Sequence, residues 1–311
     1  MNIIIAVLLS DDTDYFRIDA KSPFRRKVLN EAYSRFAEIG KENKVNVIFT
    51  KFNYLSKGVV KEYWCFEKKW KKEKEKIKPD YFFDKFEFGK TENLLKKKLS
   101  KNKKIINDFG LESFCKDKWI QAKKFYKIAP KTFLVKNKKD FLKYSKKISS
   151  EKIILKPRFG LGGQGIIVLD KKAKLKKKIV GDYVLQELID TSQGIPSTKI
   201  KGIHDLRCVI LNGKIEYAYV RQPKKGVLAN LHQGGKARMV TPPIEIRRLV
   251  RKIDLFVKKF GNRLYSADFF YGNKQFYLIE LNSKPGFDFC GRFGYKEIEN
   301  LFFKEFFKTL K

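Results

Sequence analysis

A glycine-dense turn between two apolar runs constrains this chain more than any other stretch. Residues 156–165 read Lys-Pro-Arg-Phe-Gly-Leu-Gly-Gly-Gln-Gly, with the apolar runs Ile153–Leu155 and Ile166–Leu169 on either side. This pattern predicts two strands joined by the turn. Glycines let backbone N–H groups approach an anion, and Lys156 supplies a positive charge for phosphate. The alternative is a hairpin whose glycines only satisfy turn geometry, since short motifs often match by chance.

Two well-known phosphate-binding motifs do not fit this turn. A Walker loop ends in Gly-Lys-Ser/Thr, which is not found here, and a Rossmann fingerprint opens a helix, whereas an apolar strand-like run follows Gly165. The neighbouring sequence must therefore decide what the turn binds.

The composition indicates a folded chain of two or three domains. It has 311 residues, 43% of them hydrophobic and 14% aromatic, which excludes general disorder. No apolar run approaches the roughly 18 residues of a membrane helix. Ile3–Leu9 is short and lacks a basic leader, so we predict a buried first strand and no signal peptide. The four cysteines lie far apart, which predicts a reducing cytoplasm and neither a disulfide framework nor a zinc site.

The formal net charge of +36 has two interpretations. A lysine excess can drive contact with nucleic-acid phosphates. It can also reflect compositional drift toward lysine, and the lysines are spread over predicted helix-like surfaces at 68–78, 96–104 and 171–178. Because no RNA-binding motif or DNA-reading helix is found, we favour drift, with help for anionic ligands as a minor benefit.

Residues 1–107 are predicted to form an N-terminal α/β domain. Short apolar runs predict strands at 3–9, 45–49, 63–66 and 81–84, and helical spacing predicts a helix over 25–39 that stops at Gly40. Three aspartates follow the first strand, and we interpret them as loop or helix-cap residues in preference to a cation site: Asp11, Asp12 and Asp14.

Residues 108–190 are predicted as a second, smaller unit that carries the glycine turn. Helices are expected near 119–126 and 140–148 and strands at 133–135 and 183–190, before a loop at 192–202.

Residues 191–311 contain the densest polar groups. Asn212-Gly213 predicts a hairpin between strands at 208–211 and 215–220, a second glycine-bearing loop covers 230–237, and a helix is expected over 244–260. Strands at 265–270 and 276–282 are expected to pair across Gly272-Asn273.

Three polar side chains of this last strand pair suggest a metal site. Glu280 and Asn282 project from one face, because strand side chains alternate with period two, and Asp268 on the neighbouring strand can join them. Two carboxylates and an amide oxygen suit Mg²⁺. A solvent-facing Glu280 would explain one residue, but it does not explain Glu-x-Asn in an apolar strand.

The ordered series of motifs resembles the ATP-grasp enzymes, and most closely the carboxylate–amine ligases similar to ribosomal-protein-S6 glutamate ligase. The resemblance covers residues 107–290 and rests on these pieces: Asp117-Lys118, Lys156 with its glycine turn, Gln186-Glu187, Asp205-Leu206-Arg207, residues 230–237, and Asp268 with Glu280-x-Asn282-x-x-Pro285-Gly286. It implies an α/β (α+β) chain with the ATP-grasp fold. The expected parts are an N-terminal α/β pre-ATP-grasp domain (1–107), a lid-bearing subdomain (108–190) and a C-terminal subdomain with the metal site (191–311).

The resemblance also implies roles for individual residues. Two lysines would contact the α- and β-phosphates of ATP: Lys118 and Lys156. Four glycines would form the mobile lid: Gly160, Gly162, Gly163 and Gly165. The adenine and ribose would meet Gln186, Glu187, Leu188 and either Asp190 or Asp205. One or two Mg²⁺ (or Mn²⁺) ions would be held by Asp268, Glu280 and Asn282. Charge on the transferring phosphoryl group would be stabilised by Arg207, Arg221 and Asn230.

The implied activity is ATP-dependent amide formation in the cytoplasm. A carboxylate substrate attacks the γ-phosphate to give an acyl-phosphate and ADP, and an amine (an amino acid or peptide) then displaces phosphate. No Ser-His or Cys-His catalytic arrangement is found, and His232 either touches substrate or is structural. An ATP-grasp kinase is the main alternative, and a non-enzymatic nucleic-acid-binding protein is less favoured. A membrane partner is not expected.

Overall fold

The computed structural model describes residues 2–10, 16, 22–85, 90–102, 104–160, 163–172, 175, 179–196, 198–224, 226, 235–286 and 289–311, and only the backbone of 90–92. Two compact units account for these residues. One comprises 1–111, 258–264 and 284–311, and the other comprises 112–257 and 265–283. The three predicted aspartates at 11, 12 and 14 lie outside the described residues, as does most of 171–178.

The first unit is built on a six-stranded sheet with the order β6-β5-β2-β1-β7-β8. Its strands are β1 (Ile3–Leu9), β2 (Val45–Lys51), β5 (Tyr63–Glu67), β6 (Lys69–Glu73), β7 (Tyr81–Asp84) and β8 (Ile105–Ile106). Strands β2, β1, β7 and β8 run parallel, and β5 and β6 are antiparallel. β1 is apolar throughout because a central parallel strand is covered on both faces. The four strands predicted in this region are confirmed.

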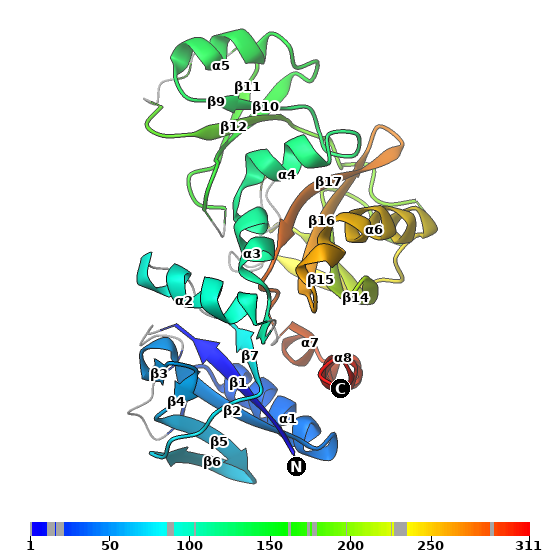
Figure 1. Ribbon diagram of the computed structural model, residues 1–311. Helices are drawn as coiled ribbons and strands as arrows, with labels where there is room; N and C mark the ends of the chain where they lie inside the picture. Colours follow the sequence, from blue (N-terminus) through cyan, green and yellow to red (C-terminus); the bar gives the residue numbers. More distant parts are fainter. Residues whose placement is uncertain are drawn as a thin grey trace. The chain divides into compact units, whose positions relative to one another are not determined.

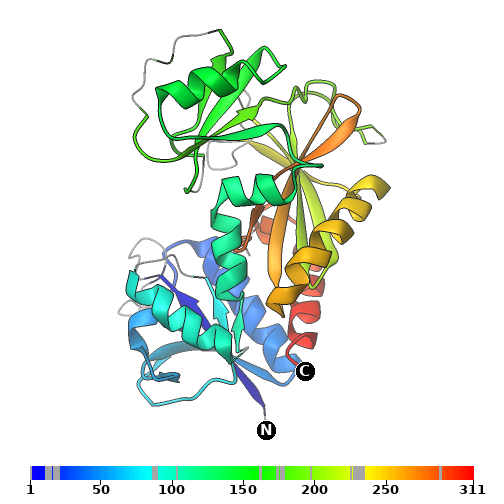
Figure 2. The same cartoon turned by 45° about the horizontal axis from the view of Figure 1, so that its top comes forward.

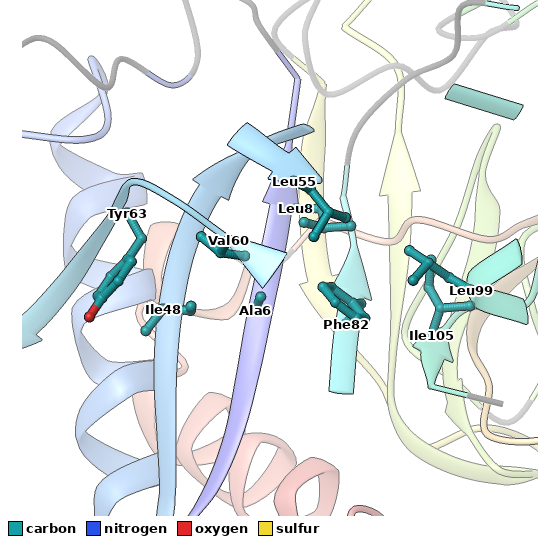
Figure 3. Close-up of a cluster of buried hydrophobic side chains, with 9 residues drawn as sticks. All are labelled: Ala6, Leu8, Ile48, Leu55, Val60, Tyr63, Phe82, Leu99 and Ile105. Atoms are coloured by element: carbon teal, nitrogen blue, oxygen red, sulfur yellow. The ribbon is translucent and has the colours of Figure 1, made fainter. Parts of the chain in front are cut away.

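Each face of this sheet packs against different elements. Alternate residues of β1, Ala6 and Leu8, join a cluster with β2, β7, α2 (Lys90–Lys101) and the short ribbon β3 (Leu55–Ser56) and β4 (Val59–Val60), as Figure 3 shows. Helix α1 (Lys27–Glu42) buries a stripe that includes Tyr33 and Phe36. Helix α8 (Lys296–Lys308) packs on α1, with the Phe36 and Phe307 rings stacked at 4.6 Å.

Two predictions for this unit were wrong. The helix expected to stop at Gly40 continues to Glu42, with Gly40 buried inside it. Residues 68–78 were expected to be helix-like, but β6 occupies part of this run and forms a hairpin with β5. The reason is Trp70, whose ring packs edge-on against Phe66 at 5.1 Å and Phe49 at 5.3 Å. A cross-strand aromatic pair of this kind stabilises a strand and overrides the helix propensity of lysine.

The second unit contains two antiparallel sheets (Figure 1). The four-stranded sheet has the order β11-β10-β12-β9, from β9 (Thr132–Val135), β10 (Lys152–Pro157), β11 (Ile167–Asp170) and β12 (Tyr183–Glu187). Phe141 of helix α5 (Lys138–Ser145) belongs to its core cluster. β10 and β11 pair antiparallel, as predicted for the strands that flank the glycine turn.

The five-stranded sheet has the order β15-β14-β13-β16-β17. Its strands are β13 (Asp205–Leu211), β14 (Lys214–Gln222), β15 (Lys236–Met239), β16 (Leu264–Gly272) and β17 (Gln275–Asn282). Helix α6 (Ile244–Val257) lies along this sheet in Figure 2, and the Tyr265 hydroxyl of β16 donates to Asp254 of α6 at 3.2 Å. The Asn212-Gly213 hairpin is confirmed. The β16–β17 turn is one residue later than predicted, at Asn273-Lys274, and both residues adopt positive φ.

The remaining helices are short. They are α3 (Phe109–Lys116), which crosses the boundary between the units, α4 (Lys118–Lys124) and α7 (Phe289–Arg292), with 3₁₀ turns at Phe52–Tyr54 and Lys258–Phe260. Within the described part of the chain, no helix has both the length and the hydropathy to span a bilayer.

Candidate nucleotide and metal site

Lys156 lies near the end of β10 in a hydrogen-bonded chain of side chains. Its ammonium donates to Gln186 Oε1 at 2.8 Å, and Gln186 Nε2 donates to Thr132 Oγ1 at 2.9 Å. β10 and β12 are adjacent, and their register places Lys156 diagonally across from Gln186 on one face of the sheet. The lysine is buried. The sheet therefore holds this ammonium in a fixed position.

The electrostatic surroundings of Lys156 connect it to the predicted metal residues. Burial lowers the pKa of Lys156 to about 8, Glu280 raises it, Lys118 lowers it further, and Asp268 raises it. These groups come from β10, α4, β16 and β17, all within the second unit. Lys156 is thus within the electrostatic reach of both carboxylates.

The glycine turn adopts conformations that favour glycine. Gly160, Gly163 and Gly165 have φ values of +135°, +76° and +72°. A Cβ on Gly165 would also lie 2.9 Å from Pro157 Cγ. Gly162 is outside the described residues.

Lys118 is attached to the same turn. Asp117 caps α4 by accepting from the Trp119 and Ile120 N–H groups, both at 3.1 Å, and the Lys118 ammonium donates to the Gly160 carbonyl at 2.6 Å. The helix cap and this bond direct Lys118 toward the turn that follows Lys156.

Two arginine–aspartate pairs cross the five-stranded sheet. Arg221 donates to both oxygens of Asp205, at 2.6 and 2.7 Å. Arg207 donates to both oxygens of Asp268, at 2.7 and 2.6 Å, and Arg221 adds a bond to Asp268 at 2.9 Å. Bidentate pairs of this kind are among the stronger hydrogen bonds in proteins.

The pKa values of the two aspartates in this network shift in opposite directions. Burial raises the pKa of Asp268, but Arg207 and Arg221 outweigh it, so the pKa of Asp268 is lowered. The pKa of Asp205 is raised by burial and by the nearby Asp268, and Arg221 counteracts this only in part. The difference arises because two guanidinium groups bond Asp268 and one bonds Asp205.

Two β-bulges set this arrangement. Next to the hairpin turn Leu211 pairs with Lys214, but a register shift between Val209 and Ile210 brings Asp205 opposite Arg221. A similar shift between Asp268 and Phe269 brings Asp268 opposite Glu280. A one-residue slip exchanges the faces of a strand, so the bulges decide which side chains meet here.

The three predicted metal ligands lie together. Asp268 and Glu280 are direct cross-strand partners, and Asn282 Nδ2 donates to Glu280 Oε1 at 3.2 Å. Among the described residues no group of three His, Cys, Asp or Glu side chains is placed to hold a metal ion. A carboxylate oxygen has two lone pairs, and Oδ1 of Asp268 uses one of them to accept from Arg207. The other lone pair can face a metal ion, so the donor set nevertheless fits one hard cation.

The predicted hinge residues have local partners. Glu187 N–H donates to the Lys131 carbonyl at 3.0 Å and Leu188 N–H to the Lys152 carbonyl at 3.3 Å. Asp190 is exposed and accepts from the backbone N–H and hydroxyl of Ser192. The predicted residues Asn230 and His232 lie outside the described residues.

Two further residues join parts of the site, and sequence reasoning missed both. Gln121 of α4 accepts from the Leu281 N–H at 2.6 Å, and so ties α4 to β17 between Glu280 and Asn282. Arg158 bonds both Asp117 and Asp182. For Arg158, the sequence signal was a long charged side chain at the start of the glycine turn. Gln121 is a buried glutamine on a short helix, and no sequence pattern marks it as part of the site.

Comparison with known proteins agrees with this architecture. An ATP-grasp ligase from Chryseobacterium gregarium, solved with ADP and a leader and core peptide, superposes with a TM-score of 0.64 at 13% identity, over 96% of this chain and 95% of that one. D-alanine–D-alanine ligase from Bacillus anthracis gives a TM-score of 0.62 at 12% identity, over 99% and 95%. These similarities establish the ATP-grasp fold, which the sequence predicted.

Sequence relatives match the part of the chain that carries the site. A protein named "Probable alpha-L-glutamate ligase" from Shewanella halifaxensis (strain HAW-EB4) is 29% identical over 144 residues, which is 44% of this chain and 29% of the relative. One of the same name from Legionella pneumophila (strain Corby) is 29% identical over 143 residues, 44% of this chain and 43% of the relative. The chain thus spans less than half the length of these relatives. The family model for the RimK-like ATP-grasp domain matches residues 115–299, more than half of the chain, and the chain therefore belongs to that family.

Proposed function

We propose that the protein is an ATP-dependent carboxylate–amine ligase that forms an amide bond through an acyl-phosphate and releases ADP and phosphate. The observation that carries the proposal is the buried Lys156 ammonium, fixed by Gln186, together with the facing carboxylates Asp268 and Glu280, which raise its pKa. A cation next to two carboxylates suits a nucleotide that brings both a phosphate chain and a metal ion.

In this proposal the chain positions the phosphates from two sides. Lys156, fixed by Gln186, and Lys118, carried by α4, contact the α- and β-phosphates. Gly160, Gly163 and Gly165 cover them as part of the lid, to which Gly162, outside the described residues, is also assigned. A closed lid keeps water from the acyl-phosphate, which would otherwise hydrolyse.

The carboxylates and arginines divide the remaining charge. Glu280, Asn282 and Asp268 would hold Mg²⁺ or Mn²⁺, which neutralises phosphate charge when bound. Arg207 and Arg221 stabilise charge on the transferring phosphoryl group, and Asn230 is assigned to the same role. Glu187 and Leu188 meet the adenine. The exposed Asp190 is a better ribose contact than Asp205, which is buried and ion-paired with Arg221.

The experiment is ADP release measured with panels of carboxylates and amines, with glutamate tested first because the sequence relatives are named glutamate ligases. We expect release that needs both substrates, an amide product, and an acyl hydroxamate when hydroxylamine replaces the amine. Lys156→Met should reduce the rate by about 100-fold or more. Lys152→Met, an exposed lysine on the same strand, is the matched control.

A phosphorylated product that is stable to hydroxylamine would contradict the ligase and favour the kinase alternative. The ligase would also be contradicted if the rate of ADP release were independent of the amine for every pair of carboxylate and amine tested.

A further inference from the structure

Arg158 joins three segments at the base of the glycine turn. Its Nε and Nη2 donate to the two oxygens of Asp117 at 2.9 and 2.6 Å, and its Nη1 donates to Asp182 Oδ2 at 2.8 Å. Asp117 precedes α4 and Asp182 precedes β12. The guanidinium fork is suited to hold two carboxylates at a fixed separation, which an ammonium cannot do.

The backbone of the same residue repeats these connections. The Arg158 N–H donates to the Asp182 carbonyl at 2.9 Å, and the Lys118 N–H donates to the Arg158 carbonyl at 3.2 Å. Side chain and main chain therefore fix the first turn of α4 against the start of the glycine turn.

Asp117 transmits this constraint to Lys118. Its oxygens accept from Arg158 while Oδ1 also caps α4 at the Trp119 and Ile120 N–H groups. Burial raises the pKa of Asp117, but the bonds from Arg158 and the helix outweigh it, so the pKa is lowered and the carboxylate stays charged. Lys118, the next residue, thus starts from a helix end whose position Arg158 determines.

Lys118 is held at the turn that follows Lys156, and its positive charge acts on that lysine. Its ammonium lowers the pKa of Lys156, and it donates to the Gly160 carbonyl. Two ammonium groups repel each other, so they stay together only where the fold holds them or an anion lies between them. The hydrogen bond to the Gly160 carbonyl is one of the contacts by which the fold holds Lys118.

We propose that Arg158 is a positioning residue that holds Lys118 at the turn that follows Lys156, so that the two ammonium groups are organised for a phosphate chain before the nucleotide arrives. The proposal rests on the nucleotide site described under the proposed function. Arg158 itself acts through Asp117 and does not contact the phosphates.

The test is a double-mutant cycle on binding of a non-hydrolysable ATP analogue with Mg²⁺, measured by calorimetry. We expect Arg158→Met and Lys118→Met each to weaken binding by about tenfold or more. The double variant should bind no more weakly than Lys118→Met, because Arg158 acts only through Lys118. Arg248→Met, an exposed arginine on α6, should bind like the wild type.

A second variant separates the ion pair from the helix cap. Asp117→Asn keeps an N-cap residue but loses the charge that Arg158 pairs with, so it should weaken binding as Arg158→Met does while the melting temperature changes little. Arg158→Lys should not restore binding, because an ammonium cannot bond both oxygens of Asp117 and reach Asp182.

Fully additive losses in the double variant would overturn this role for Arg158, as would wild-type affinity in Arg158→Met or Asp117→Asn. Failure of the wild type to bind the analogue would instead overturn the proposed function and this inference together.

Discussion

Arg207 and Asp268 form a two-pronged ion pair between neighbouring strands, with Nε and Nη2 of Arg207 at 2.7 and 2.6 Å from the two carboxylate oxygens. Arg221 adds a third bond to the same aspartate. Asp268 therefore holds two arginines in place as well as facing Glu280. Asp268 and Glu280 should therefore contribute differently to the stability of the fold, and a variant of each residue can measure the difference.

The first prediction compares Asp268→Asn with Glu280→Gln. Loss of Asp268 should lower the free energy of unfolding by about 3–5 kcal/mol, because two mostly buried arginines lose a charged partner. Glu280 is half-buried, and its loss should cost about 1 kcal/mol or less. Both variants should lose nearly all ADP release. Urea unfolding and steady-state rates measure the two effects, and equal stability losses would contradict the distinction.

The second prediction concerns pH. The pKa of Lys156 is about 8, so its ammonium loses its proton as pH rises through that value. The dissociation constant of an ATP analogue should be flat below about pH 7 and rise by up to tenfold per pH unit above about pH 8. Lys156→Arg should remove this dependence, because a guanidinium stays charged. Glu280→Gln should move it to lower pH, because Glu280 raises the pKa of Lys156. Calorimetry at several pH values checks all three.

The lowered pKa of Lys156 affects the free energy of unfolding in the opposite direction, because stability should increase with pH whereas nucleotide binding should weaken. The folded-state pKa of Lys156 lies below the value of about 10.4 for an unfolded chain. Between these values the unfolded chain binds more protons, so Lys156 makes the nucleotide-free protein more stable as pH rises from about 8 to about 10.4. A wild-type minus Lys156→Met difference that falls over this range would contradict the shift.

Local patterns predicted much of the fold and of the site. The Asn212-Gly213 turn, the strands around the glycine turn and the shared face of Glu280 and Asn282 all follow from spacing within a few residues. The register of distant residues does not. Counting outward from the Asn212-Gly213 turn would place Val220 opposite Asp205, and only the bulge brings Arg221 there. Bulges carry no reliable sequence signature, so this pairing could not be predicted.

Contacts across longer stretches of sequence were also beyond prediction. Arg158 meets Asp117 through the packing of α4 against the turn, and Phe36 meets Phe307 across nearly the whole chain. Sequence patterns show that such residues are buried or charged, but the fold decides their partners.

The third prediction tests the geometry of the glycine turn. Gly165→Ala forces a side chain into a positive-φ position and within 2.9 Å of Pro157 Cγ, so it should strain the turn and weaken nucleotide binding by about tenfold. Gly58→Ala has a similar φ of +81° but no neighbour within 4 Å, and it lies in the first unit. It should therefore cost only the backbone strain and leave binding unchanged. Equal affinities of the two variants would contradict the prediction.

The last prediction concerns α8, which packs within the first unit although it is far in sequence from the strands of that unit's sheet. Phe307 is fully buried, and its ring stacks on Phe36 of α1. Phe307→Ala should lower the free energy of unfolding by about 3–5 kcal/mol, because the vacated volume cannot be refilled by the fixed sheet and helices around it. Leu301, on the same helix, is 62% exposed, and Leu301→Ala should change stability by about 0.5 kcal/mol or less. Urea unfolding of both variants checks this. If Phe307→Ala lowered the free energy of unfolding as little as Leu301→Ala does, α8 would not be part of the core of the first unit.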